Sequence, residues 1–203
     1  MTEPAANRKH LILDAACRAI ARTGAAAVRV SDVAREAGVS TALVHYYFPS
    51  RADVILRAFA HADDLADAVA EEHLAELASG RERVERLILT WAGDDPAIRT
   101  NWAVWNEMWQ YAAHNEAARA MVADSHQRWL DQVTQLIGEG RDDGSIPADV
   151  DVDAAARRLA ACVDDWGRET LIGMRTPAGM RAALTAATAH ELGPVPRARG
   201  RAA

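Results

Sequence analysis

Glycine and proline divide this chain into segments with the composition of α-helices. The spacing of these helix-breaking residues limits the fold more than any other feature. Alanine, leucine, arginine and glutamate dominate the segments, and the alternating apolar pattern of a β-strand is nearly absent. The predicted helices cover residues 8–23, 31–37, 40–47, 50–78, 81–92, 96–113, 116–139, 152–173 and 177–191. The sequence therefore predicts an all-α protein of about nine helices.

Residues that begin helices stand at several of the predicted boundaries. Ser40, Ser50 and Thr176 are placed to cap the N-termini of the helices that follow them. Pro96 and Pro177 each suit the first position of a helix, because that position needs no N–H donor. These residues support the boundaries drawn from the hydrophobic pattern.

The segment from residue 33 to residue 48 has the pattern of two short helices joined by a tight turn. Ala34 is small enough for the crossing point of two steeply inclined helices, and Gly38 can take the positive φ that a short reversal requires. Four apolar residues are spaced to hold the second helix against the first: Val33, Val39, Leu43 and Val44. An ordinary helical hairpin shares single features of this kind, but their joint occurrence favours a helix-turn-helix.

The match to a known pattern extends past this hairpin. The run Tyr47-Phe48-Pro49-Ser50-Arg51-Ala52-Asp53-Val54-Ile55 resembles the segment that joins the recognition helix to the fourth helix in the TetR family of transcriptional repressors. The first helix and the break at Gly24 also lie where that family has them, so the resemblance covers about residues 8–60. It implies a three-helix head with a DNA-binding helix-turn-helix, followed by a larger helical domain for ligand binding and dimerisation.

The resemblance, together with side-chain chemistry, assigns roles in binding a double-stranded DNA operator. Residues near the start of the second helix of the pair, and those facing outward from it, would contact bases or lie next to them: Ser40, Thr41, Ala42, His45 and Tyr46. Tyr47 and Arg51 would hold phosphates, although the Tyr47 ring can instead pack in the core. Family members usually carry threonine where this chain has Arg29, so either Arg29 contacts a phosphate or Ser31 takes over as the helix cap.

The distribution of charge agrees with a head that binds DNA. Residues 1–60 carry eight Lys or Arg against five Asp or Glu, a net charge of +3, although the whole chain has −6. We therefore divide the chain into a helix-turn-helix domain at 1–52, an effector-binding and dimerisation domain at 53–192, and a tail at 193–203. The tail is predicted to be disordered because it has too little apolar surface to bury.

All six tryptophans lie C-terminal to the head in the sequence. The layout of this region resembles the effector domain of the choline-sensing, BetI-like branch of the family. Trp102, Trp105 and Trp109 form one stripe by helical spacing, and a second stripe contains Trp166 and Thr170. The stripes are either core or the lining of a pocket for a small organic effector, cationic or aromatic. The resemblance favours the pocket, with these lining residues: Trp102, Trp105, Trp109, Trp129, Trp166 and Thr170. Three nearby carboxylates are predicted to face solvent: Glu107, Asp164 and Asp165.

Two further expectations concern assembly and location. As the family does, the helices at 152–173 and 177–191 would pair with their mates in a second subunit to form a homodimer. Alanine-rich faces on the last helix permit close approach, although such faces are also common on plain surfaces. With neither a membrane span nor a signal peptide in the sequence, we expect a cytoplasmic protein.

Other functional classes find less support in the residues. The sequence contains no phosphate-binding loop, no GxSxG or HExxH motif and no cluster of metal ligands, so we expect no enzyme, no cofactor and no metal. Cys17 and Cys162 lie far apart and are expected to be small buried hydrophobes. The remaining alternatives are a TetR-like activator and an interaction module that does not respond to an effector.

Overall fold

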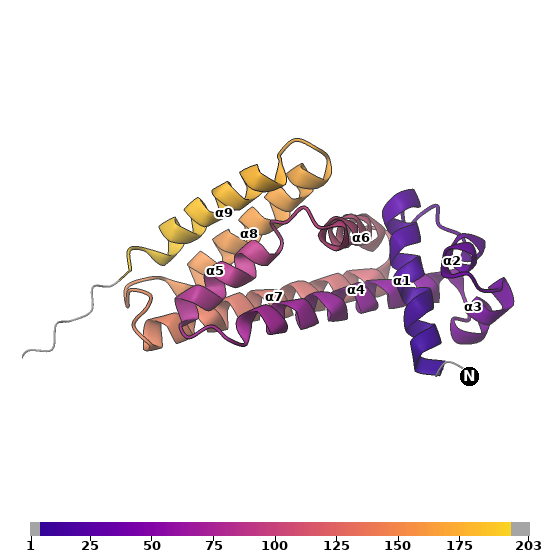
Figure 1. The fold of residues 1–203 in the computed structure, drawn as a ribbon, viewed down its shortest axis with the longest axis horizontal. Helices are drawn as coiled ribbons and strands as arrows, with labels where there is room; N and C mark the ends of the chain where they lie inside the picture. Colours follow the sequence, from indigo (N-terminus) through magenta and orange to yellow (C-terminus); the bar gives the residue numbers. More distant parts are fainter. Residues whose placement is uncertain (1–4, 196–203) are drawn as a thin grey trace, which may run out of the picture. The chain divides into compact units, whose positions relative to one another are not determined.

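The computed structural model describes residues 5–195, and within them it contains nine α-helices and no strand, which confirms the all-α prediction (Figure 1). The helices are α1 (Ala5–Thr23), α2 (Val30–Ala37), α3 (Thr41–Tyr47), α4 (Arg51–Leu74), α5 (Gly80–Thr90), α6 (Pro96–Ala112), α7 (Glu116–Asp142), α8 (Val152–Leu171) and α9 (Pro177–Leu192). Each lies within four residues of its predicted bounds. Most of the predicted tail at 193–203 lies outside the described residues.

The predicted caps are present and explain why these helices begin where they do. The hydroxyl oxygens of Ser40, Ser50 and Thr176 each accept a hydrogen bond from the backbone N–H three residues on, at 3.2, 3.1 and 3.0 Å. Pro96 and Pro177 occupy the first turns of α6 and α9. Local chemistry therefore sets the start of each of these helices.

The chain packs as two compact units, each built from two separate stretches. Within the described residues, the first contains 5–69 together with 95–125, and the second contains 70–94 together with 126–195. This packing division differs from the predicted functional division at residue 52, because α6 and the start of α7 pack on the head. The functional division remains a prediction.

The first unit has one continuous apolar core that joins the head to α6. Ile12 and Ile20 of α1 are completely buried, as is Val44 of α3. Val104 and Met108 of α6, with 1% and 3% of their surface exposed, belong to the same cluster. The three-helix head is therefore built on α6 rather than attached to it by a loose linker.

The second unit brings α5 against α9, and α8 and α9 run side by side in it (Figure 1). One face of α9 is buried within the unit and consists of Met180, Leu184, Thr188 and Leu192. Arg81 is also buried, and its guanidinium donates to the carbonyls of Ser145, Leu192 and Gly193 at 2.9, 2.8 and 2.7 Å. A buried cation that binds three carbonyls fixes the C-terminal end of α9 to α5.

The backbones of α5 and α7 approach very closely in the second unit. A Cβ atom at Gly80 would overlap the backbone of Gly140, and one at Gly140 would lie 2.5 Å from Cδ1 of Ile146. Only glycine leaves room for this contact.

None of the helices in the described part of the chain is both long enough and apolar enough to cross a bilayer.

Candidate DNA-binding surface and ligand-binding residues

The turn between α2 and α3 has the geometry that the sequence predicted. Gly38 lies in the left-handed region, with φ 66° and ψ 29°, where a Cβ would be unfavourable. The N–H of Val39 donates to the carbonyl of Ala34 at 2.9 Å, and Ala34 is buried at the crossing of the two helices. The chain therefore reverses in three residues and begins α3 on the Ser40 cap.

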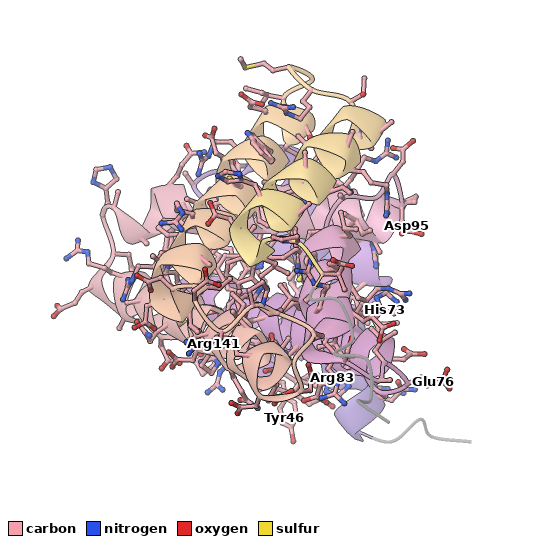
Figure 2. All side chains as sticks on the ribbon, turned by 90° about the vertical axis from the view of Figure 1, so that its left-hand side faces the viewer. Tyr46, His73, Glu76, Arg83, Asp95 and Arg141 are labelled. Atoms are coloured by element: carbon pink, nitrogen blue, oxygen red, sulfur yellow. The ribbon has the colours of Figure 1, made fainter. Side chains whose placement is uncertain are left out.

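The predicted outward face of α3 is exposed. Thr41, Ala42, His45 and Tyr46 are all accessible, and Tyr46 leaves 79% of its surface exposed, with its side chain projecting away from the helices (Figure 2). The Tyr47 ring is half-buried, packs on the head core and meets Tyr46 edge to face at 5.1 Å between ring centroids. Tyr47 thus helps to build the core while part of it stays at the surface.

The start of α2 excludes one of the two alternatives given above, namely that Ser31 caps this helix. The helix begins at Val30 with Arg29 as the extended residue before it, so Ser31 lies inside the helix and is not the cap. The carboxylate of Asp32 accepts the backbone N–H of Arg29 at 3.0 Å. The Arg29 guanidinium, which can only donate, extends into solvent and makes no ion pair with the described residues.

Arg51 lies at the start of α4, yet its guanidinium binds the protein itself. Its Nε donates to the carbonyl of Val28, and its Nη2 donates to the carbonyls of Ala25 and Ala26, each at 2.6 Å. These three bonds hold the loop that joins α1 to α2. A phosphate contact by Arg51 remains a prediction, and it would share a side chain that this loop already uses.

Glu107 was predicted to face solvent, and this prediction is wrong. The side chain is half-buried, and its Oε2 accepts the backbone N–H of Ala25 at 2.8 Å. Helical phase correctly set Glu107 apart from the tryptophan stripe, but that side of α6 faces the head. No local sequence pattern shows this, because the bonded residues are 82 positions apart.

An ion-pair cluster joins α1 to α2. The carboxylate of Glu36 accepts from Nε of Arg18 at 3.1 Å and from Nη1 of Arg22 at 3.0 Å. Hydrogen bonds from these two arginines hold the pKa of Glu36 below its usual value. The Glu36 carboxylate therefore stays ionised to a lower pH than an ordinary glutamate, and the cluster keeps its ion pairs into mild acid.

The structure divides the predicted ligand-binding residues between the two units. Trp102, Trp105 and Trp109 lie on α6 of the first unit, and Trp105 packs on the head core. Trp129 and Trp166, with Thr170, lie in the second unit. None of these five tryptophans is fully buried, so each of them keeps some exposed surface.

Two of the predicted residues on α8 already have partners within the second unit. The guanidinium of Arg175 lies over the Trp166 ring, 5.1 Å from its centroid, and its Nε pairs with Glu169 at 2.7 Å. The hydroxyl of Thr170 donates to the carbonyl of Trp166 at 2.8 Å. Trp166 thus shows directly that an indole face in this chain holds a cation.

The two carboxylates of α8 differ from each other. Asp165 is exposed, as predicted, and pairs with Arg168 at 3.4 Å. Asp164 is only half-exposed and lies 3.9 Å from Nδ1 of His126, and burial raises its pKa. The prediction of a solvent-facing side chain is therefore wrong for Asp164.

The second unit also contains an open polar groove of about 340 Å³. It is lined by Glu71, Leu74, Ala75, Arg83, Gln132, Gln135, Leu136 and Glu139. Arg83, labelled in Figure 2, pairs with Glu139 at 3.0 Å, so the charge on that carboxylate is already compensated. The groove has no aromatic lining, and the tryptophan stripes do not contribute to it.

Comparison with known protein families agrees with this architecture. Residues 12–58 match the model for bacterial regulatory proteins of the tetR family, and residues 80–193 match the model for the C-terminal domain of BetI-type transcriptional repressors. The chain therefore belongs to the TetR family, in the branch with a BetI-type C-terminal domain. This confirms both resemblances found in the sequence.

Individual relatives support the same assignment. The HTH-type transcriptional regulator BetI of Agrobacterium fabrum is 32% identical over 117 residues, and the match covers 57% of this chain and 56% of that protein. The chain thus matches a little over half the length of this relative.

Two solved structures match over more of the chain. A putative transcriptional regulator from Saccharomonospora viridis, in complex with choline, has a TM-score of 0.84 and 34% identity, covering 96% of this chain and 100% of that one. A putative TetR-family regulator from a Rhodococcus species has a TM-score of 0.82 and 29% identity, covering 93% and 100%.

Proposed function

We propose that this protein is a transcriptional repressor that binds a pseudo-palindromic DNA operator through α3. The observation that carries the proposal is the exposed face of Thr41, Ala42, His45 and Tyr46 on a short helix that is capped by Ser40 and held by a buried Val44. A helix of this kind can enter the major groove, where hydroxyl and aromatic groups contact base edges. The protein would act by binding rather than by catalysis, in the cytoplasm where bacterial DNA is found.

The proposed repressor is a homodimer that pairs α8 and α9 with their mates. A single head buries only about 600–1,000 Å² on DNA, so useful affinity requires two heads on two half-sites. The faces of α9 that the second unit leaves uncovered are rich in alanine, with Ala182 and Ala186 exposed. Small residues of this kind would let two helices approach closely.

Arg29 is the best candidate for a phosphate contact in the head. We expect Arg29→Ala to weaken binding to DNA from the region upstream of the gene, because one cation per subunit no longer neutralises a phosphate. The slope of log affinity against log salt is negative, and each lost contact makes it shallower by about 0.9. Fluorescence anisotropy at several salt concentrations measures this slope.

Arg141→Ala is the matched control for this measurement. Arg141 is an exposed arginine of α7 in the second unit, and its loss changes the net charge equally (Figure 2). If both variants make the slope shallower by the same amount, Arg29 makes no local phosphate contact. If the unaltered protein fails to bind even at low salt, DNA binding itself is refuted and an interaction module becomes the better explanation.

We further propose that the effector is a small quaternary ammonium compound such as choline. The relative from S. viridis binds choline, and this chain carries half-exposed tryptophans on α6. Indole faces attract cations by about 0.5–2 kcal/mol according to their degree of desolvation. Choline binding would weaken operator binding, and operator DNA would weaken choline binding by the same factor.

Tryptophan fluorescence tests the nature of this ligand. We expect choline to bind about 3- to 30-fold more tightly than 3,3-dimethylbutanol, its uncharged analogue of similar shape. Trp102→Phe should reduce the preference for choline, because a phenyl ring attracts cations less than an indole. Trp91→Phe, at a tryptophan outside the predicted set, should leave it unchanged. Equal affinity for both compounds would exclude a cation-binding cage.

A further inference from the structure

Ala25 lies in the loop after α1, so its N–H is outside the hydrogen-bond pattern of that helix. Gly24 ends α1 with φ +83°, and this left-handed residue turns the following N–H away from the helical hydrogen-bond pattern. Ala25 is buried, with 1% of its surface exposed, so water does not replace the missing bond. The Oε2 atom of Glu107 accepts this N–H at 2.8 Å.

The approach of Glu107 depends on the residue that ends α1. A Cβ atom at Gly24 would lie 3.0 Å from Oε2 and 3.5 Å from Cδ of Glu107. Glycine therefore serves this position twice, because it permits the left-handed backbone and leaves room for the carboxylate. The bond is built into the end of α1 rather than added at its surface.

The loop from Gly24 to Val28 is held from two helices. Arg51 of α4 binds its carbonyls at residues 25, 26 and 28, and Glu107 of α6 binds its N–H at residue 25. The loop leads directly into Arg29, the residue that precedes the first turn of α2. The position of the loop therefore determines the position of the Arg29 backbone, from which the guanidinium extends.

The helix that carries Glu107 is anchored in the core of the first unit. On the same helix, Val104 and Met108 are buried in the core that α6 shares with the head. A side chain that projects from a helix fixed in this way holds its carboxylate in a defined place. Glu107 can thus transmit the position of α6 to the loop.

We propose that Glu107 is a positioning residue for operator binding. It fixes the loop between α1 and α2, and through this loop it places Arg29 at a phosphate. The proposal rests on the proposed function for its DNA contact, whereas the hold on the loop can be measured without DNA. The operator ligand is the sugar-phosphate backbone of double-stranded DNA.

Three variants of the full-length protein test this role: Glu107→Ala, Glu107→Gln and Gln110→Ala. We expect Glu107→Ala to weaken operator binding about tenfold, as the loss of one buried hydrogen bond at a binding element does. Glu107→Gln should restore affinity to within about twofold, because the amide oxygen still accepts the N–H of Ala25. Gln110→Ala, an exposed change on the same helix, should behave as the unaltered protein.

A double-mutant cycle separates positioning from a general loss of stability. If Glu107 acts through Arg29, Glu107→Ala and Arg29→Ala are not additive, and the double variant binds DNA about as well as either single one. It also has the salt slope of Arg29→Ala. Additive losses would overturn the proposal, since they would show that the two residues act independently.

Amide hydrogen exchange of Ala25 tests the hold on the loop without DNA. The exchange rate should rise in Glu107→Ala and stay low in Glu107→Gln, while amides of α8 and α9 are unchanged. Unchanged exchange in Glu107→Ala would refute the hold on the loop, whatever the operator data show. A changed exchange rate in a protein that binds no operator would instead refute the proposed function and leave the hold on the loop standing.

Discussion

We expect Gly80→Ala to lower the free energy of unfolding by about 3 kcal/mol, one of the two largest effects predicted for a single substitution in this chain. The added methyl group would overlap the backbone of Gly140. A backbone cannot rotate aside as a flexible side chain can, so the chain around Gly80 and Gly140 must shift to make room for the methyl group. Chemical denaturation followed by circular dichroism measures the change.

Gly138→Ala is the control, because it makes the same substitution on α7 without a steric cost. A Cβ atom at Gly138 would meet nothing within 4 Å. Alanine is favoured over glycine in a helix by about 0.5–1 kcal/mol, so this variant should be slightly more stable than the unaltered protein. If Gly80→Ala has the same free energy of unfolding as Gly138→Ala, the close contact of Gly80 with Gly140 does not exist.

Arg51→Ala should produce a loss of similar size in the first unit. The substitution leaves the carbonyls of Ala25, Ala26 and Val28 without their donor, and hydrogen bonds to a charged group contribute about 1.5–3 kcal/mol each. The bonds to Ala25 and Val28 are partly buried, and the bond to Ala26 is exposed. Part of this is regained from water, because Ala26 is exposed. We therefore expect a net loss of about 3 kcal/mol, measured by thermal unfolding.

Arg57→Ala on the same helix is the control for this experiment. Arg57 is exposed and pairs with Asp53 at 3.7 Å, an arrangement that contributes about 0.3–0.5 kcal/mol. If Arg51→Ala unfolds at the same temperature as Arg57→Ala but binds DNA poorly, then Arg51 serves as a phosphate ligand, as the family resemblance first implied.

The sequence predicted the features of this protein that depend on short stretches of chain. The nine helices, the caps at Ser40 and Thr176 and the turn at Gly38 were all predicted correctly. Each is determined by residues within about four positions of one another, so a local pattern suffices. The exposed face of α3 followed in the same way from helical spacing around Val44.

Features that depend on distant residues were not predicted. Helical phase showed only that Glu107 leaves the tryptophan stripe, and its partner Ala25 is 82 positions away. The family resemblance, together with side-chain chemistry, assigns Arg51 to a phosphate, and nothing in the sequence indicates that three carbonyls lie within its reach. The packing of α6 on the head likewise depends on a fold that a linear pattern does not encode.

The guanidinium over Trp166 has a consequence for ligand affinity. Arg175 is nine residues from Trp166 in the same chain and is tied to Glu169, so it is present at a high effective concentration. A charged compound that used this side of the indole would first have to displace a tethered competitor. Its binding free energy would then be the difference between the free energies of two cation contacts. Replacing Arg175 with a shorter, uncharged residue would therefore tighten the complex.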